Sequence, residues 1–320
     1  MKARRSNSAG PFYISHKIEA IRHKKDRAFP RYLRKHVSIM KSCKSILMIS
    51  TAFLLAACGG NAGKDEPDPE PIPEIMTAKP TVKKDQSISS SVLGMSIKYS
   101  VWLPPTYDPA KSYPVLYLLH GYEFDTTDAH NKWLSTSSGW GGSPDGGNLS
   151  SIATRYVRDG GELFIIVTPN GQNAFYMDNY DYRGLKYGTF FIDEFIPHIE
   201  KQFKGNGKRA IAGLSMGGNG TLYHGLWHPD MFTYMYAMSP ATFNLDGVLG
   251  KADKSKIPPI TIETGTEDGT VTLESVQAFV NKLKDKEIPC EFITRSGGHT
   301  WQFWQECLPK ALKKVGESFK

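Results

Sequence analysis

The sequence has little cysteine, no zinc-ligand spacing and no apolar segment long enough to cross a membrane. Only 4 of its 320 residues are cysteine, and none occurs at the short spacings of a zinc site. The main apolar stretch, residues 46–57, is shorter than the roughly 20 apolar residues that a membrane-spanning helix needs. No internal repeat is visible. These absences argue against a zinc module, a repeat array and a membrane-embedded protein.

An excess of basic residues is also lacking outside the first 39 positions. The chain has 39 Lys and Arg against 32 Asp and Glu, but residues 1–39 hold 11 of the basic and 2 of the acidic ones. The rest of the chain therefore has 28 basic and 30 acidic residues. A body with that balance has no evident surface for tracking phosphates, so we expect no nucleic-acid partner.

The segment that follows is typical of a bacterial lipoprotein signal. A basic stub after Met40 leads into a short apolar stretch and then into the lipobox-like sequence Leu-Ala-Ala-Cys58. We expect residues 1–39 to be an upstream segment absent from the mature protein and residues 40–57 to be a removed signal peptide. Cys58 would then carry the lipid. A plain signal peptide with an incidental cysteine is the alternative.

Residues 58–82 are predicted to form a tether between the lipidated cysteine and the folded body. They are polar, acidic and rich in proline, so they have little to bury. We expect a cell-envelope location, as an outer-membrane lipoprotein that is either periplasmic or surface-exposed, with the lipid as its only contact with the membrane.

The remainder, residues 83–320, is predicted to be one α/β domain. Apolar strand-like runs without alternation suggest a mostly parallel central sheet buried on both faces, with helices covering both. The strands are expected at 113–119, 163–168, 209–213, 232–238, 259–263 and 289–294. Helical faces repeat at 191–203 and 273–283, and 88–103 is expected to be an antiparallel edge hairpin. On the last strand and the helix after it, Cys290 and Cys307 could form a disulfide or be two buried thiols.

One Gly-x-Ser-x-Gly motif, Gly213-Leu214-Ser215-Met216-Gly217, lies between an apolar strand and a segment capable of forming a helix. A strand, a tight turn and a helix are what a nucleophile elbow requires, because the turn leaves no room for side chains beside the serine. Ser215 is therefore the candidate nucleophile. A glycine-rich turn with an idle serine is the alternative.

An acid and a base follow Ser215 in the chain order of such hydrolases. Asp268 follows the strand at 259–263 and is our candidate acid, with Glu267 and then Glu263 as substitutes. His299 lies on a glycine-rich loop after the last strand and is the candidate base. The backbone N–H groups of Met216 and Tyr122 are predicted to form the oxyanion hole.

The other histidines are expected to have structural or surface roles. His120 begins a turn, and His224 and His228 lack the glutamate of a zincin helix. His130 and His198 are expected at the surface, without partners.

With these residues placed, residues 88–315 resemble the esterase D-like branch of the α/β-hydrolases, which includes feruloyl and acetylxylan esterases of carbohydrate esterase family 1. The resemblance is carried by the following motifs: Tyr-Pro-Val-Leu-Tyr-Leu-Leu-His-Gly121, Val-Thr-Pro-Asn-Gly171, Gly-Leu-Ser215-Met-Gly-Gly218, Gly-Thr-Glu-Asp268 and Gly-Gly-His299-Thr-Trp301. It implies an α/β-hydrolase fold, a Ser-His-Asp triad and no metal or organic cofactor. Asn170 stands where the family often carries an acidic residue.

The resemblance and the predicted secretion together suggest an ester hydrolase that removes feruloyl or acetyl groups from plant cell-wall polysaccharide. Aromatic residues crowd the loops expected around the cleft, and Trp140, Tyr176 and Trp301 are the candidates for stacking on substrate. Core packing is the alternative, above all for Trp304. An esterase for siderophores or small acyl esters, an acyltransferase and a non-catalytic carbohydrate-binding lipoprotein are the rival functions.

Overall fold

The structure, a computed structural model, describes residues 73–320. The upstream segment, the predicted signal peptide, Cys58 and the tether up to residue 72 lie outside the described residues. A short helix, α2 (Glu74–Thr77), lies within the stretch assigned to the tether, and the first strand begins at Thr81, just before the predicted end of the tether at residue 82. In residues 73–320, no helix is both long and apolar enough to span a bilayer.

Eight strands form one sheet in the order β1-β2-β4-β3-β5-β6-β7-β8. Their bounds are β1 (Thr81–Ser90), β2 (Met95–Leu103), β3 (Tyr113–Leu119), β4 (Ile165–Pro169), β5 (Gly205–Leu214), β6 (Met235–Met238), β7 (Ile260–Gly265) and β8 (Cys290–Arg295). The neighbours from β4 to β8 pair in parallel, and β1 and β2 pair antiparallel at one edge. The six predicted strands and the mostly parallel sheet are confirmed.

The edge hairpin is longer than predicted, because β1 begins at Thr81 and not near residue 88. The first half of β1 is polar and largely exposed, so it has no alternation of buried apolar residues by which the sequence could reveal a strand.

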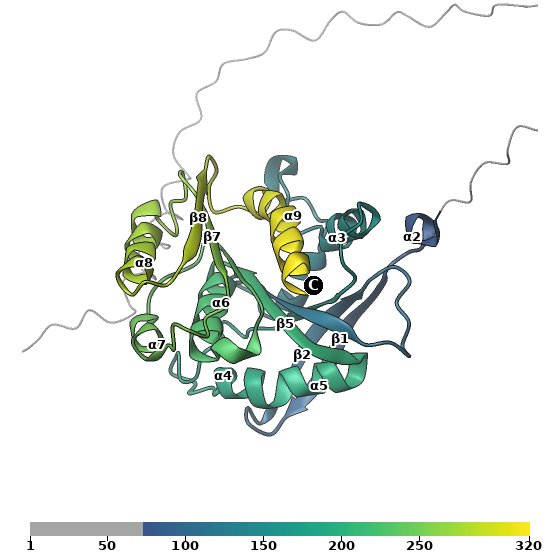
Figure 1. Cartoon of the computed structure of the whole chain (residues 1–320), viewed down its shortest axis with the longest axis horizontal. Coiled ribbons are helices and arrows are strands. Elements are labelled where there is room, and N and C mark those ends of the chain that lie inside the picture. The colour runs from purple at the N-terminus through teal and green to yellow at the C-terminus, as the bar shows by residue number, and fades with distance from the viewer. Residues whose placement is uncertain (1–72) are drawn as a thin grey trace, which may run out of the picture. The chain divides into compact units, whose positions relative to one another are not determined.

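Helices cover both faces of the sheet (Figure 1). One face carries α3 (Leu149–Arg158) and α9 (Trp301–Ser318), which pack on each other. The other carries the following elements: α4 (Tyr187–Phe190), η3 (Phe191–Phe195), α5 (Ile196–Phe203), α6 (Met216–Trp227), α7 (Asp246–Lys251) and α8 (Leu273–Asp285). Shorter 3-10 turns are η1 (Ala129–Leu134), η2 (Trp140–Gly142) and η4 (Pro229–Met231).

The core lies in two layers, one on each side of the sheet. Along β3, Val115, Tyr117 and Leu119 belong to the layer under α5 and α6, whereas Leu116 and Leu118 belong to the layer under α3 and α9. A strand buried on both faces must be apolar at every position, which explains why β3 shows no alternation in the sequence.

Two histidines expected at the surface without partners both have partners, and one of the two is buried. His130 is fully buried, and its Nε2 lies 2.8 Å from a carboxylate oxygen of Asp85. His198 is partly buried, with Nε2 3.0 Å from the hydroxyl of Tyr99. The prediction was wrong because both partners lie far away in the chain and are brought close only by the folding of β1 and β2.

The two cysteines of the domain are free thiols. Cys290 begins β8 and Cys307 is buried within α9. Burial raises the pKa of each thiol to about 12, which keeps both protonated and unreactive at neutral pH.

Candidate active site

Ser215 lies on a sharp turn between the end of β5 and the start of α6, as a nucleophile elbow requires. Its backbone has a φ of 53°, in the left-handed region that a residue with a side chain rarely adopts. A Cβ at Gly217 would lie 2.4 Å from the carbonyl oxygen of Leu119, and one at Gly213 would lie 2.5 Å from the backbone of Gly217. The two glycines are therefore needed for the turn to pack against β3.

The loops after β7 and β8 bring Asp268 and His299 to this serine. The Nε2 atom of His299 lies 2.9 Å from the Oγ atom of Ser215, and its Nδ1 atom lies 2.7 Å from a carboxylate oxygen of Asp268. The three side chains therefore form a continuous hydrogen-bonded series. The structure brings together all three residues that the sequence selected.

The environment of Asp268 keeps its carboxylate ionised. Burial alone would raise its pKa, but the hydrogen bond from His299 and two backbone N–H groups outweigh that effect and hold the pKa below its usual value. Those N–H groups belong to Thr270 and Val271, at 2.9 and 2.8 Å from the second carboxylate oxygen. A carboxylate fixed in this way keeps the Nδ1 proton of His299 in place and leaves Nε2 to accept the serine proton.

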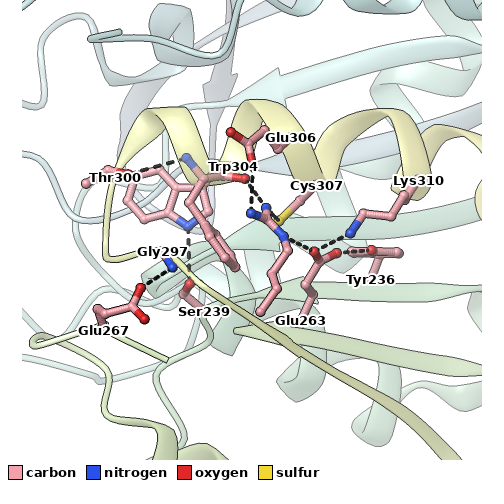
Figure 2. Close-up of polar contacts among 12 residues, drawn as sticks. Tyr236, Ser239, Glu263, Glu267, Gly297, Thr300, Trp304, Glu306, Cys307 and Lys310 are labelled. Atoms are coloured by element: carbon pink, nitrogen blue, oxygen red, sulfur yellow. Dashed lines mark hydrogen bonds and ion pairs between the residues drawn. The ribbon is translucent and has the colours of Figure 1, made fainter. Parts of the chain in front are cut away.

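Neither substitute acid contacts the imidazole. The carboxylate of Glu267 accepts a hydrogen bond from the backbone N–H of Gly297 (Figure 2). It also accepts one from the hydroxyl of Ser296. Glu263 is fully buried within β7, where its carboxylate is engaged by side chains of neighbouring elements. The geometry therefore selects Asp268 from the three carboxylates.

The predicted oxyanion donors are next to the serine. Met216 is the first residue of α6, so its backbone N–H has no acceptor within the helix. The backbone before Tyr122 passes close by, because a Cβ at Gly121 would lie 3.4 Å from the Cβ of Ser215. The oxyanion role of the two N–H groups stays a prediction.

His120 has a part in this loop that the sequence did not reveal. Its Nδ1 donates to the carbonyl oxygen of Gly121 at 2.6 Å, and its Nε2 accepts from the N–H of Gly171 at 2.8 Å. Complete burial lowers its pKa to about 4, so it remains neutral at neutral pH. Because a trans peptide directs its C=O and N–H to opposite sides, this bond also fixes the direction of the Tyr122 N–H. In the sequence, the one sign of this role is that a histidine directly follows the first central strand.

Two of the three stacking candidates are wrong, because they are in the interior. Tyr176 is fully buried, and its hydroxyl bonds the backbone N–H and C=O of His120 at 3.0 and 3.2 Å. Trp301 is the first residue of α9 and packs edge-on against the buried Trp133, with 5.3 Å between ring centroids. As expected, Trp304 is also buried. The composition of a loop does not reveal whether an aromatic ring points to solvent or into the core.

Trp140 is 98% exposed and stays a candidate, and the structure adds two further aromatic side chains. Tyr122 and Phe124, in the loop after β3, are 58% and 91% exposed. The ammonium of Lys132 lies 3.5 Å from Glu123 and 3.8 Å from Asp145, so it connects this loop to the one that carries Trp140. We refer to Tyr122, Phe124 and Trp140 as the aromatic rim.

Comparison with known proteins identifies the family. Residues 90–315 match the Esterase family, described as "Putative esterase". This chain belongs to the Esterase family. The esterase is 26% identical over 239 residues to the acetyl esterase of Caldicellulosiruptor saccharolyticus, a match that covers 62% of this chain and 81% of that one. It is 29% identical over 228 residues to an endo-1,4-beta-xylanase/feruloyl esterase of Xylanibacter ruminicola, covering 68% of this chain but only 29% of that protein.

Solved structures agree with this assignment. A ferulic acid esterase is 31% identical, with a TM-score of 0.64, and the match covers 76% of this chain and 100% of that one. The fold is shared with a ferulic acid esterase from Anaeromyces mucronatus, solved with ferulic acid, at 21% identity and a TM-score of 0.59, over 75% of this chain and 92% of that one. The esterase is therefore a carboxylic-ester hydrolase with the α/β-hydrolase fold.

Proposed function

We propose that this esterase acts through an acyl-enzyme in which Ser215 is the nucleophile, His299 the general base and Asp268 the residue that orients the imidazole. The observation that carries the proposal is the unbroken series from the Ser215 Oγ through both nitrogens of His299 to Asp268, at 2.9 and 2.7 Å. A serine hydroxyl is a poor nucleophile near neutral pH until an imidazole accepts its proton.

In this mechanism His299 takes the proton of Ser215 as Oγ attacks the ester carbonyl. The tetrahedral oxyanion accepts hydrogen bonds from the N–H groups of Met216 and Tyr122, and each such donor contributes about 3–4 kcal/mol of transition-state stabilisation. His299 then protonates the leaving alcohol. Water, deprotonated by the same imidazole, releases the acid and regenerates the hydroxyl.

We infer further that the substrates are feruloyl or acetyl esters of plant cell-wall polysaccharide. The names of the relatives support both acyl groups. The aromatic rim supports a flat ligand, because exposed aromatic side chains can stack on a phenolic ring or a sugar, and one of them, Tyr122, directly follows Gly121, which approaches Ser215. No metal or organic cofactor is required by this chemistry.

Acyl transfer to a sugar hydroxyl is the second candidate. The chain is 29% identical over 135 residues to the diacylglycerol acyltransferase/mycolyltransferase Ag85A of Mycobacterium leprae, a match covering 39% of this chain and 36% of that one. Such an activity would use the same acyl-enzyme and differ only in the acceptor that attacks it.

The substrate class is tested on p-nitrophenyl acetate, methyl ferulate and acetylated xylan, with wild type and Trp140→Ala. We expect wild type to hydrolyse the small ester and at least one of the other two. Removing one stacking ring, worth about 0.5–1.5 kcal/mol, should raise the KM for methyl ferulate or xylan roughly two- to tenfold and leave p-nitrophenyl acetate within twofold.

The matched control is Trp227→Ala, at a partly exposed tryptophan that ends α6. It should leave the KM for methyl ferulate and for xylan unchanged. Activity confined to the small ester would reject the cell-wall substrate while leaving the hydrolase in place. Product analysis with xylo-oligosaccharide as acceptor separates transfer from hydrolysis.

We also propose that the mature protein is a cell-envelope lipoprotein anchored through Cys58, with the tether holding the domain off an outer membrane. The lipobox-like sequence and the Pro-rich segment support this. In bacterial cells that process lipoproteins, the chain from Met40 onward should partition into the detergent phase on Triton X-114 separation. Cys58→Ala should shift it to the aqueous phase with unchanged specific activity, and equal partitioning of the two would reject the anchor.

A further inference from the structure

An ionised carboxylate is buried beside the last strand, outside the proposed triad. Glu263, in β7, is fully buried and accepts hydrogen bonds from three elements (Figure 2). The hydroxyl of Tyr236, in β6, lies 2.5 Å from one carboxylate oxygen. The Nε of Arg295, the last residue of β8, lies 2.7 Å from the other, which also accepts from Lys310 of α9.

The charge on this carboxylate needs an explanation. Burial alone would raise the pKa of Glu263, but the hydrogen bonds from Lys310, Tyr236 and Arg295 outweigh burial and hold the pKa below its usual value. Apolar side chains of similar volume often hold such elements together as well as a buried ion pair does, or better. Stability is therefore not a sufficient reason for placing this carboxylate in the core, with its cationic partners Arg295 and Lys310 partly exposed.

The guanidinium of Arg295 connects Glu263 to the first two turns of α9. One terminal nitrogen donates to the backbone carbonyl of Phe303 at 2.7 Å and to the thiol of Cys307 at 3.3 Å, and the other donates to Glu306 at 2.7 Å. The guanidinium also lies over the ring of Phe303, 3.7 Å from its centroid. One side chain thus fixes the end of β8 relative to the beginning of α9.

The short connection between those two points, residues 296–300, carries His299. Phe303 packs against this connection, since a Cβ at Gly297 would lie 2.5 Å from its ring. Trp304 meets the imidazole of His299 edge-on, with 4.8 Å between centroids and an interplanar angle of 88°. A displacement of α9 relative to β8 would therefore move the imidazole.

We propose that Glu263 and Arg295 are positioning residues, which hold the start of α9 against the end of β8 so that His299 falls between Asp268 and Ser215. The inference rests on the proposed function, because it assigns the pair an effect on the catalytic base. Neither residue contacts the serine. Arg295 acts by fixing both ends of the connection, and Glu263 acts by fixing the direction of the guanidinium.

The first test is Glu263→Gln, which keeps the shape of the side chain and removes its charge. With p-nitrophenyl acetate we expect kcat to fall roughly 10- to 100-fold and KM to stay within about threefold, because a misplaced base slows proton transfer without changing the binding surface. Circular dichroism measures the folded fraction, and kcat is expressed per folded molecule.

Because the single variant leaves Lys310 without its acid and Arg295 with Glu306 as its one remaining acid, a second variant replaces the three charges that meet at Glu263, as Glu263→Leu, Arg295→Met and Lys310→Met. An apolar cluster should keep or raise the melting temperature. A positioning role predicts at least a tenfold loss of kcat in this stable protein, whereas a purely structural role predicts full activity.

The matched control is Lys314→Met, which breaks the ion pair to Glu291, at 3.1 Å, between the same helix and strand but at the surface. It should leave kcat unchanged. A wild type inactive on every ester would reject the proposed function itself. An active wild type whose triple variant lies within twofold of it would overturn the positioning role alone, whatever the loss in Glu263→Gln.

Discussion

Replacing Ser215 by alanine should lower kcat on p-nitrophenyl acetate by about 10⁶-fold. Among the three proposed triad side chains, only the Oγ atom of Ser215 forms the bond to the acyl carbon. Without the hydroxyl, His299 has no proton to accept from the enzyme. The effect should be on kcat and leave substrate binding nearly intact. Initial rates at high enzyme concentration, compared with the buffer rate, measure it.

The oxyanion donors are backbone groups and survive this substitution, so a residual acceleration of about 10³–10⁴ over the uncatalysed rate is expected. Alanine should also relieve little of the strain at this φ of 53°, because it too has a Cβ. Ser89→Ala, at an exposed serine of β1, is the matched control and should retain full activity. A Ser215→Ala enzyme with activity near wild type would remove this serine from the mechanism.

Asp268→Asn should lower kcat by about 10⁴-fold, with the fold preserved. The buried carboxylate accepts the Nδ1 proton of His299 at 2.7 Å. An amide at the same place can donate to Nδ1 instead, and the imidazole would then carry its proton on Nε2 and could not accept one from Ser215. Steady-state kinetics together with a thermal melt separate this effect from any loss of stability.

Glu267→Gln is the informative comparison, because Glu267 is the adjacent acid and its carboxylate bonds the backbone of Gly297 instead of the imidazole. It should lower kcat at most about tenfold, since the backbone N–H of Glu267 still donates to the carbonyl oxygen of Gly297 and holds the His299 connection. Equal losses in the two variants would mean that the acid of the triad was assigned incorrectly.

Much of the fold was predictable because the sheet is buried on both faces. Strands such as β3 and β4 must be apolar at successive positions, and that pattern is visible in the sequence without any knowledge of their neighbours. The nucleophile elbow was predictable for a similar reason. A Cβ at Gly213 would lie 2.5 Å from the backbone of Gly217 within the same strand–turn–helix unit, and a Cβ at Gly217 would lie 2.4 Å from Leu119 of β3. Both requirements appear in the sequence as glycines within five consecutive residues, which is why the motif could be found.

The site was less predictable wherever its contacts join distant segments. Glu263 lies within β7, and Glu267 and Asp268 follow it within three residues of its end. Only the placement of the next loop shows which of the three carboxylates receives the imidazole. The role of His120 in holding the Gly121 peptide depends likewise on Gly171, which comes from the loop after β4.

Neighbouring residues are enough to predict the central strands, several helices, the serine elbow and the candidate base, and to narrow the acid to three carboxylates, because each of these signals is local. The packing of distant segments determines which aromatic side chains reach solvent: Trp140 is exposed, while Tyr176 and Trp301 are buried. It also determines that Glu263 and Arg295 meet beneath the start of α9. Burial and pairing of this kind depend on residues far away in the chain, and composition near a residue does not record them.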